Sequence, residues 1–412
     1  MGYLLEAPLM RFDTVLRRSG DVDVDLVSRE EAALLARDKA ARPFRQAFVV
    51  VLDGGLSRAD VANRVAAQIA GHPRWRCVPT GWPAPVWTAD AGFNLLGHVR
   101  EAVLAKPETL ESWLAARLAA PSDRSHPLWE LWLLRLPDLE TTALVCLSHP
   151  AQSGPVQLLS ALLDTAPAAI PAATMGPVAA VDNPFEPLAG IGRGLHAAFD
   201  TASNFAGAEP RKLYVAGIQL DWLPIPAIAA ANGCAVHDVL VSLVGSGLAS
   251  WRSCPGDIVA LVPMAVSTQA GRSQVGKNVY LPLTEPDAHS RLLNLASLTQ
   301  THIASGIAVG AGELREISVF DQHADASFAM LGGGNHQLYV SNAPGPSGEL
   351  YFGPRRVRGI SAFTAPMEEL ASVGITRYGN QVTFAIAATS PLEGFGRGMM
   401  NALAELRRTE GG

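Results

Sequence analysis

Residues 165–190 (TAPAAIPAATMGPVAAVDNPFEPLAG) constrain the fold most, because they are rich in alanine and proline and almost uncharged. Proline fixes its own φ angle and lacks a backbone donor, so helical or strand periodicity ends in such a segment. Regular apolar patterns occupy the chain on both sides of it. The sequence therefore predicts two halves of similar size, 1–165 and 211–412, joined by a linker or crossover over 166–210.

Each half alternates short apolar strand patterns with amphipathic helical patterns. In the first half, Ser28 and Ser57 stand at helix-capping positions before two helical patterns. Strands are predicted there over 48–52, 129–136 and 141–147. The second half is predicted to hold strands over 212–220, 258–266, 337–342 and 382–388, and helices over 225–232, 236–251, 291–301 and 393–407. This order is typical of an α/β (α+β) protein whose sheets are backed by helices.

Charged residues make up only 17% of the 412 residues, against about a quarter in typical soluble domains. Such a chain either buries much of its surface or presents apolar surface to another molecule.

The net charge is -6 and no basic run is present, which argues against nucleic acid as a partner. The cysteines are far apart, so no disulfide framework is expected and a reducing cytoplasm suits them. Neither a secretory signal nor a membrane span is predicted.

The segment SHPAQSG, residues 148–154, follows a predicted buried strand and directly precedes a predicted helix. A side chain at such a junction projects into the crevice at the strand ends, where helix N-termini offer N–H groups to a developing anion. A neutral imidazole at His149 can take a proton from a hydroxyl or a thiol there. Gly154 allows the turn to close. Spacing alone also fits a structural histidine.

SHPAQSG resembles the HHxxxDG motif of the chloramphenicol-acetyltransferase-like acyltransferases, a superfamily that includes peptide-synthetase condensation domains. Other segments resemble the wax ester synthase/diacylglycerol acyltransferase family within it. PSDRSHPLWELWL (121–133) is similar to that family's PLDRSRPLWE segment, and SNAPGPSGELYFG (341–353) is similar to its SNVPGP segment. VHDVLVSLVGSGL (236–248) and ITRYGNQVTFAI (375–386) resemble two further segments. The resemblance covers nearly the whole chain in the right order.

The resemblance implies two chloramphenicol-acetyltransferase-like subdomains in a pseudo-twofold arrangement, with a tunnel between them. It also implies that a long acyl chain moves from acyl-CoA, a co-substrate, to the hydroxyl of diacylglycerol or a fatty alcohol. His149 would be the general base, and no metal or other cofactor would be needed. The resemblance further implies a cytoplasmic protein, or one that associates peripherally with the inner membrane or with the surface of lipid droplets.

The active-site motif departs from the family pattern at two positions. Ser148 replaces the first histidine and Ser153 replaces the aspartate. In the superfamily that aspartate holds the loop through a charged hydrogen bond to an arginine, and a serine cannot form such a pair. We therefore expect the His149 loop to be held by other contacts. In the helix segment, His237 stands where the family has asparagine, while Asp238 is kept.

Supporting roles are expected for several other residues. Asp123 and Arg124 would join loops of the two halves by an ion pair, or would form a solvated turn. Asn342 would hydrogen-bond a loop backbone near the tunnel, and His237 and Asp238 would lie at a helix cap or on the surface. Two other functions stay open: a non-catalytic lipid-binding or scaffold protein, and a condensation-type enzyme whose acyl donor is bound to a carrier protein.

Overall fold

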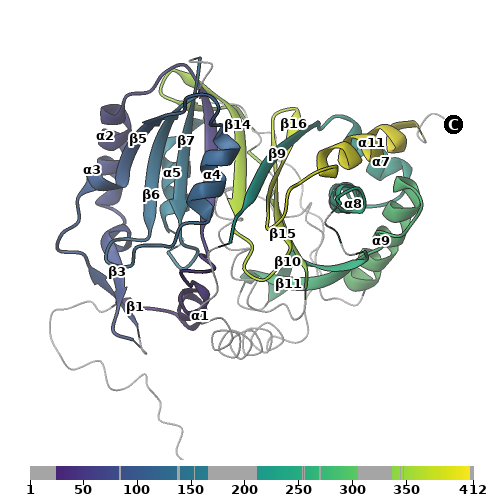
Figure 1. The fold of residues 1–412 in the computed structure, drawn as a ribbon, viewed down its shortest axis with the longest axis horizontal. Helices are drawn as coiled ribbons and strands as arrows, with labels where there is room; N and C mark the ends of the chain where they lie inside the picture. The colour runs from purple at the N-terminus through teal and green to yellow at the C-terminus, as the bar shows by residue number, and fades with distance from the viewer. Residues whose placement is uncertain are drawn as a thin grey trace, which may run out of the picture.

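The computed structural model describes residues 25–82, 85–136, 140–152, 154–165, 211–252, 254, 256–268, 271–304, 336–343, 345–346 and 348–408. The predicted linker over 166–210 lies outside the described residues. The described parts form two lobes, each a sheet with helices packed on it (Figure 1).

The first lobe contains a seven-stranded sheet whose strands follow the order β5-β6-β7-β2-β14-β13-β8. Alternate side chains of its long central strands point to opposite faces, and both faces are buried. The strands are β5 (Val99–Val103), β6 (Trp129–Arg135), β7 (Thr141–Ser148), β2 (Gln46–Asp53), β14 (Arg355–Thr364), β13 (Leu350–Phe352) and β8 (Asp164–Thr165).

Helices cover the two faces of this sheet. On one face, α2 (Arg58–Ile69) and α5 (Gly154–Leu162) share a core with Phe48, Val50 and Leu52 of β2. On the other face, α4 (Leu110–Leu118) packs with Ala47 and Val49 of the same strand. A small sheet and short helices complete the lobe: α1 (Arg29–Arg37), α3 (Leu95–His98), a 3-10 turn (Pro73–Arg76), β1 (Asp25–Leu26), β3 (Cys77–Thr80) and β4 (Val86–Ala89).

The second lobe contains a six-stranded sheet in the order β11-β10-β12-β15-β16-β9. Its central helix α8 (Val236–Ala249) is buried over nearly its whole length. The strands are β9 (Tyr214–Asp221), β10 (Ile258–Thr268), β11 (Gly271–Leu281), β12 (Leu338–Ala343), β15 (Ala371–Tyr378) and β16 (Gln381–Ala388), and the other helices are α7 (Pro224–Ala231), α9 (Ala288–Ala304) and α11 (Phe395–Arg408).

Strands β13 and β14 come from the second half of the sequence but belong to the sheet of the first lobe. Strand β14 pairs with β2 over Thr364↔Gln46 to Val357↔Leu52, and β13 pairs with β8. The range 211–412 therefore does not form a lobe by itself, because residues 350–364 cross to the other sheet. This crossover places β14 beside β15 and β16 of the second-lobe sheet, at the seam between the two lobes.

The predicted α/β class and two-lobed architecture are confirmed, and the predicted strands and helices lie within a few residues of the observed ones.

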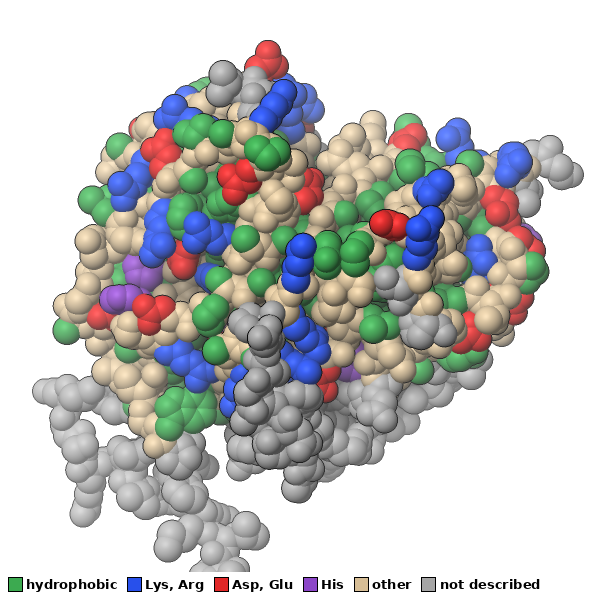
Figure 2. Space-filling view, in the orientation of Figure 1, with side chains coloured by type: hydrophobic (Ala, Val, Ile, Leu, Met, Phe, Trp, Pro, Cys, Tyr) green, Lys and Arg blue, Asp and Glu red, His purple; other side chains and the backbone are tan. Residues whose placement is uncertain are grey.

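Within the described residues, no single helix has the length and apolarity to cross a membrane. Only the pair α7 and α8, with a 104° bend between them, reaches that length and apolarity together. Charged side chains of both signs are scattered in small groups over the face shown in Figure 2.

Candidate active site

His149 lies directly after β7, at the turn that leads into α5. Its backbone N–H donates to the carbonyl of Leu128 (2.9 Å), and its carbonyl accepts from the N–H of Gln152 (2.9 Å). Leu128 stands just before β6, the strand that pairs with β7. The turn is thus fixed on two neighbouring strands, and the His149 side chain has 0% exposed area.

Burial sets the charge and the tautomer of the His149 ring. Burial, followed by the positive charges of Arg124 and Arg45, lowers the pKa of His149 to about 3, so the ring is neutral at pH 7. Nδ1 accepts a hydrogen bond from the N–H of Ala151 (3.0 Å). Because one nitrogen of a neutral imidazole accepts and the other carries the proton, the proton in this arrangement is on Nε2.

Asp38 faces that second nitrogen and was not expected from the sequence. Its Oδ2 lies 3.8 Å from Nε2 of His149 and 3.5 Å from a guanidinium nitrogen of Arg124, while Oδ1 accepts from the N–H of Phe44 (2.8 Å). Burial raises the pKa of Asp38, although the Phe44 N–H and Arg124 act in the opposite direction. Asp38 follows α1, far from the motif in sequence, so only tertiary folding brings it to the ring.

Arg124 joins α1 to the site, but Asp123 is not its partner. Arg124 donates to the carbonyls of Leu35 (2.5 Å) and Asp38 (3.0 Å), in addition to its ion pair with Asp38. Asp123 instead accepts from the backbone and hydroxyl of Ser125, and these hydrogen bonds lower its pKa. The expected Asp123–Arg124 ion pair is therefore replaced by Arg124–Asp38, and Asp123 forms the local turn.

An apolar cluster with members from both lobes reaches the His149 ring through Phe44. The Phe44 ring meets His149 edge-on, with 6.1 Å between the ring centroids. Phe44 and Ala151 belong to a buried cluster that also contains residues of α1 and of the second-lobe sheet, namely Ala33, Leu34, Leu35, Trp87, Leu128, Leu261, Tyr339 and Met367. This cluster joins α1 of the first lobe to β10 and β12 of the second, and Phe44 connects it to the His149 ring.

Several buried polar atoms of the first lobe have no hydrogen-bond partner among the described residues. They are Nε2 of His149, the hydroxyls of Ser148 and Ser122, and Nε of Arg45. Buried polar atoms in folded proteins are nearly always paired, so a group of unpaired ones calls for an explanation. A polar ligand atom or ordered water beside His149 would satisfy its Nε2, which makes the surroundings of His149 a candidate binding site.

Gln152 holds the His149 loop through its side-chain amide. Its Oε1 accepts from the N–H of Leu128 (2.5 Å), and its Nε2 donates to the carbonyls of Arg74 (2.9 Å) and Cys77 (3.2 Å). The side chain is 1% exposed. Ser153 lies outside the described residues, and Gly154 begins α5. The loop is therefore held by a neutral amide, in line with the expectation that other contacts replace the charged pair.

Replacing Gln152 with alanine leaves the N–H of Leu128 buried and unpaired. We expect the free energy of unfolding to fall by about 1–3 kcal/mol, the usual cost of such a group. Urea unfolding of the Gln152→Ala variant measures this loss. Gln68→Ala, on the partly exposed face of α2, is the control and should change stability little. Equal stability of both variants would show that Gln152 does not hold the loop.

Buried His237 and partly buried Asn342 form a hydrogen-bonded pair in the other lobe. The Asn342 amide donates to Nδ1 of His237 (3.0 Å), and burial lowers the pKa of His237 to about 4. His237 is therefore not the surface or cap residue that was expected, and Asn342 bonds a side chain rather than a loop backbone. Asp238 does cap α8, since it accepts from the N–H of Ala235 (2.9 Å).

Both buried histidines make stability depend on pH. The unfolded chain takes up protons on these rings as the pH falls below their ordinary pKa of 6.5, whereas the folded chain does not until about pH 4 for His237 and about pH 3 for His149. Stability is thus highest above pH 6.5 and falls with decreasing pH, by up to about 1.4 kcal/mol per pH unit for each ring. The raised pKa of Asp38 opposes this in part.

Urea unfolding between pH 4.5 and 7.5 measures this dependence. The His149→Gln variant lacks one of the two rings, so its stability should fall less steeply toward acid pH than that of the wild type. Identical slopes for the two proteins would contradict the buried, neutral state of His149.

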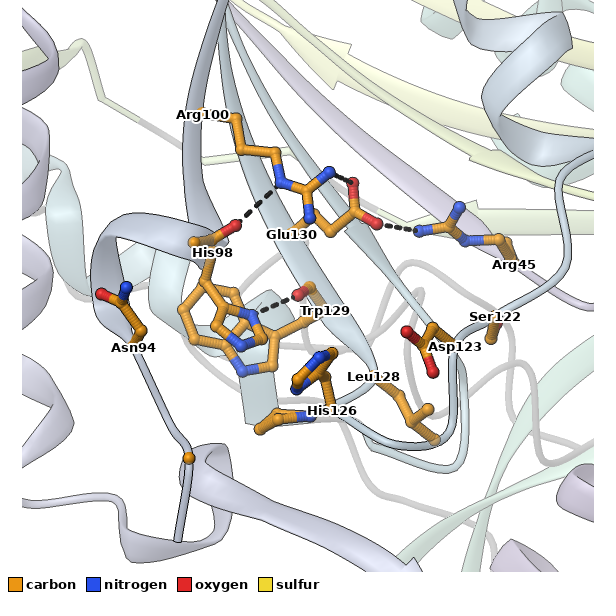
Figure 3. Close-up of a pocket in the computed structure, with 13 residues that line it drawn as sticks. Arg45, Asn94, His98, Arg100, Ser122, Asp123, His126, Leu128, Trp129 and Glu130 are labelled. Atoms are coloured by element: carbon orange, nitrogen blue, oxygen red, sulfur yellow. Dashed lines mark hydrogen bonds and ion pairs between the residues drawn. The ribbon is translucent and has the colours of Figure 1, made fainter. Parts of the chain in front are cut away.

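A cavity of about 270 Å³ adjoins the His149 loop (Figure 3). Leu128, one of its lining residues, bonds the loop through both its N–H and its carbonyl. In this cavity Glu130 lies between Arg45 (3.4 Å) and Arg100 (3.8 Å). Burial alone would raise the pKa of Glu130, but these arginines and Trp132 lower it. Asp123 also lines the cavity, so two carboxylates face two arginines and the cavity offers no strong net charge to a ligand.

The fold and the motif together define a class of protein. A structure titled "First condensation domain of the calcium-dependent antibiotic synthetase in complex with substrate analogue 3a" matches with a TM-score of 0.55 and 15% identity, over 95% of this chain and 97% of that one. The wax ester synthase/diacylglycerol acyltransferase from Marinobacter aquaeolei VT8 matches with a TM-score of 0.67 and 20% identity, over 94% of this chain and 100% of that one. The architecture is thus that of the condensation-type, chloramphenicol-acetyltransferase-like proteins.

The family follows from sequence models. The wax ester synthase/diacylglycerol acyltransferase catalytic domain matches residues 56–203, and the C-terminal domain of the same family matches residues 278–405. The chain belongs to the wax ester synthase/diacylglycerol acyltransferase family. It is also 33% identical over 138 residues to the Mycobacterium tuberculosis protein named "Probable diacylglycerol O-acyltransferase tgs3", a match that covers 31% of this chain and 51% of that protein. The chain thus spans about half the length of that curated relative.

Proposed function

We propose that this chain is an O-acyltransferase that moves a long acyl group from a CoA thioester to the hydroxyl of a lipid alcohol, with His149 contacting that hydroxyl. Family membership supports the reaction class. The observation that carries the site is the unpaired Nε2 of His149, fully buried next to an apolar cluster that both lobes form. A hydroxyl placed there would satisfy the ring.

The reaction needs two proton transfers, from the hydroxyl to His149 and from His149 to the leaving thiolate, and the replacement of a carbon–sulfur bond by a carbon–oxygen bond. His149 takes the proton of the acceptor hydroxyl, and the oxygen attacks the thioester carbonyl. The carbon–sulfur bond then breaks, the ester forms, and the CoA thiolate leaves and receives the proton. A general base contributes about 10²–10⁴-fold to such a rate.

The arrangement of His149 in this structure has to change before that step. Nε2 carries the ring proton and faces Asp38, while Nδ1 is bound to the N–H of Ala151. A base needs a free lone pair, so the proton must move to Nδ1 and the hydroxyl must enter between Nε2 and Asp38. Substrate binding would supply the energy for this rearrangement, because each buried methylene of the acyl chain contributes about 0.8 kcal/mol.

The direct test uses the purified protein with long-chain acyl-CoA and either diacylglycerol or a fatty alcohol. The expected result is release of CoA in a one-to-one ratio with a new ester. A parallel reaction supplies the acyl group on a phosphopantetheinyl carrier protein in place of CoA. Ester formation from the carrier alone would replace the CoA donor by a carrier-bound one, and no ester from any donor would reject the proposal.

A second candidate is a non-catalytic lipid-binding protein with the same fold. The complete burial of His149 and the serines at positions 148 and 153 favour it. If loss of the motif is the only defect, the double variant Ser148→His/Ser153→Asp should form ester while the wild type does not. The wild type would then bind a fluorescent fatty acid without turnover.

Peripheral association with a lipid surface also stays a prediction. Flotation of the protein with liposomes of neutral and anionic lipids tests it.

A further inference from the structure

A second cavity, of about 640 Å³, lies at the junction of the two lobes. One wall comes from β2 and β14 of the first-lobe sheet. The other comes from β9 and from the turn between β15 and β16 of the second-lobe sheet. In Figure 1 these strands lie next to one another where the lobes meet. None of its lining residues belongs to the His149 site described above.

Two arginines line this cavity with more than half of each side chain exposed. Arg356 is 58% exposed and Arg358 is 57% exposed. Arg358 stands at a β-bulge, because the pairing of β14 with β2 shifts between Val357 and Gly359. A bulge redirects a side chain out of the regular ladder, and here it turns a guanidinium toward the cavity.

The arginines are paired with carboxylates in a way that a ligand can replace. Arg358 pairs with Asp53 and Arg356 pairs with Glu349, and both carboxylates are also more than a third exposed. Exposed ion pairs contribute little to the free energy of folding. A ligand anion can therefore replace either carboxylate as the partner of the arginine with little loss of stability. Arg355, beside them in sequence, has no ion pair with any described residue.

The remaining polar side chains of the cavity are mostly neutral groups that can donate. Gln219, Asn380 and Gln381 contribute amides, while Asp53 is the only carboxylate among the lining residues. Guanidinium and amide donors around an open cavity fit an anion with several oxygen acceptors. Phosphate has this chemistry, and arginine binds it through paired N–H donors.

The cavity and His149 lie toward opposite ends of the same strand. Gln46 of β2 pairs with Ser148, next to His149, whereas Val51 and Asp53 of β2 line the cavity. Five to seven residues of strand separate the two places, or roughly 17–23 Å at about 3.3 Å per residue. Between them, packed apolar side chains fill the seam, among them Val49, Leu147, Phe363 and Ala385.

We infer that this cavity binds the phosphate groups of the acyl donor, with Arg356 and Arg358 as the principal contacts; the inference rests on the proposed acyl-CoA function. A CoA thioester carries its phosphates at one end and its reactive carbonyl beyond a long, thin pantetheine arm. That separation corresponds to the spacing between the cavity and His149. The arm would run along the seam and displace apolar side chains there.

The test compares two donors that differ only in the phosphate-bearing part. In the double variant Arg356→Gln/Arg358→Gln, the KM for acyl-CoA should rise at least tenfold. The kcat/KM for the matching acyl-N-acetylcysteamine thioester, which carries no phosphate, should stay unchanged. Arg252→Gln, an ion-paired arginine of the second lobe that is more exposed (83%) and does not line the cavity, is the control and should leave both values unchanged. An unchanged KM for acyl-CoA in the double variant would overturn the inference.

Binding measurements separate this inference from the proposed function. Calorimetry with CoA and with adenosine 3′,5′-bisphosphate needs no turnover. Binding to the wild type that is lost in the double variant supports the cavity assignment even if no ester forms. Absence of binding to the wild type overturns it. If the double variant keeps CoA binding but loses binding to vesicles of phosphatidic acid in phosphatidylcholine, the phosphate belongs to a lipid and the CoA assignment is wrong.

Discussion

Replacing His149 with glutamine is expected to lower kcat for ester formation by about 10²–10⁴-fold, the usual contribution of a general base. Glutamine fills much of the same space and keeps an acceptor for the N–H of Ala151, so the turn after β7 should persist. The acyl chain and the alcohol still bind, and KM should change much less than kcat. The measurement is the initial rate of CoA release, with the ester quantified in parallel.

His126→Gln is the matched control for this experiment. The His126 side chain is 60% exposed and contacts Asp90 at 3.5 Å, so its loss should leave the rate unchanged. Far-ultraviolet circular dichroism checks that the His149 variant is folded. A folded His149→Gln protein with wild-type kcat would remove this ring from the chemistry and leave the reaction to another group.

Replacing Asp38 with asparagine is expected to lower kcat by ten- to a thousandfold. The ring becomes positive when it takes the proton, and the negative charge of Asp38, which lies 3.8 Å from Nε2 before the hydroxyl enters, stabilises that charge. A charge pair near 4 Å contributes up to about 4 kcal/mol at an effective dielectric constant of about 20. Asparagine keeps the acceptor for the N–H of Phe44, so the segment after α1 stays in place.

The kinetic pattern distinguishes this role of Asp38 from a structural one. A group that acts on the ring only in the transition state lowers kcat and kcat/KM equally and leaves KM unchanged. Asp123→Asn is the control, because Asp123 contacts only its own turn residue Ser125 among the hydrogen bonds described here. A rise in KM without a change in kcat would mean that Asp38 shapes the binding site instead.

Local sequence determined most of the secondary structure. Ser28 caps α1 and forms a capping box with Glu31, as the spacing predicts. The apolar run over 141–147 forms β7, whose residues are all buried. These elements depend on interactions between residues close in the chain or on a repeating apolar pattern, and both are visible in the sequence. The motif resemblance also identified the family.

Tertiary structure decided what surrounds His149. Nothing near residue 38 indicates that its carboxylate reaches a ring more than a hundred positions later, and the apolar enclosure joins residues of both lobes. The second-lobe pair of His237 and Asn342 likewise joins a helix start to a strand end. Such contacts depend on how sheets and helices pack, and no local pattern encodes them.

The sequence by itself determined the family, the position of the motif histidine, most helices and the most apolar strands, because periodicity and capping act over a few residues. It did not predict β11 (Gly271–Leu281), β14 or β15 as strands. Only the tertiary structure placed β13 and β14 in the sheet of the other lobe, and only it brought Asp38 and Arg124 to His149. It also brought the arginines of β14 to the lobe junction. The physical reason is that pairing and burial between distant segments depend on the whole packed chain, whereas propensity depends on each segment alone.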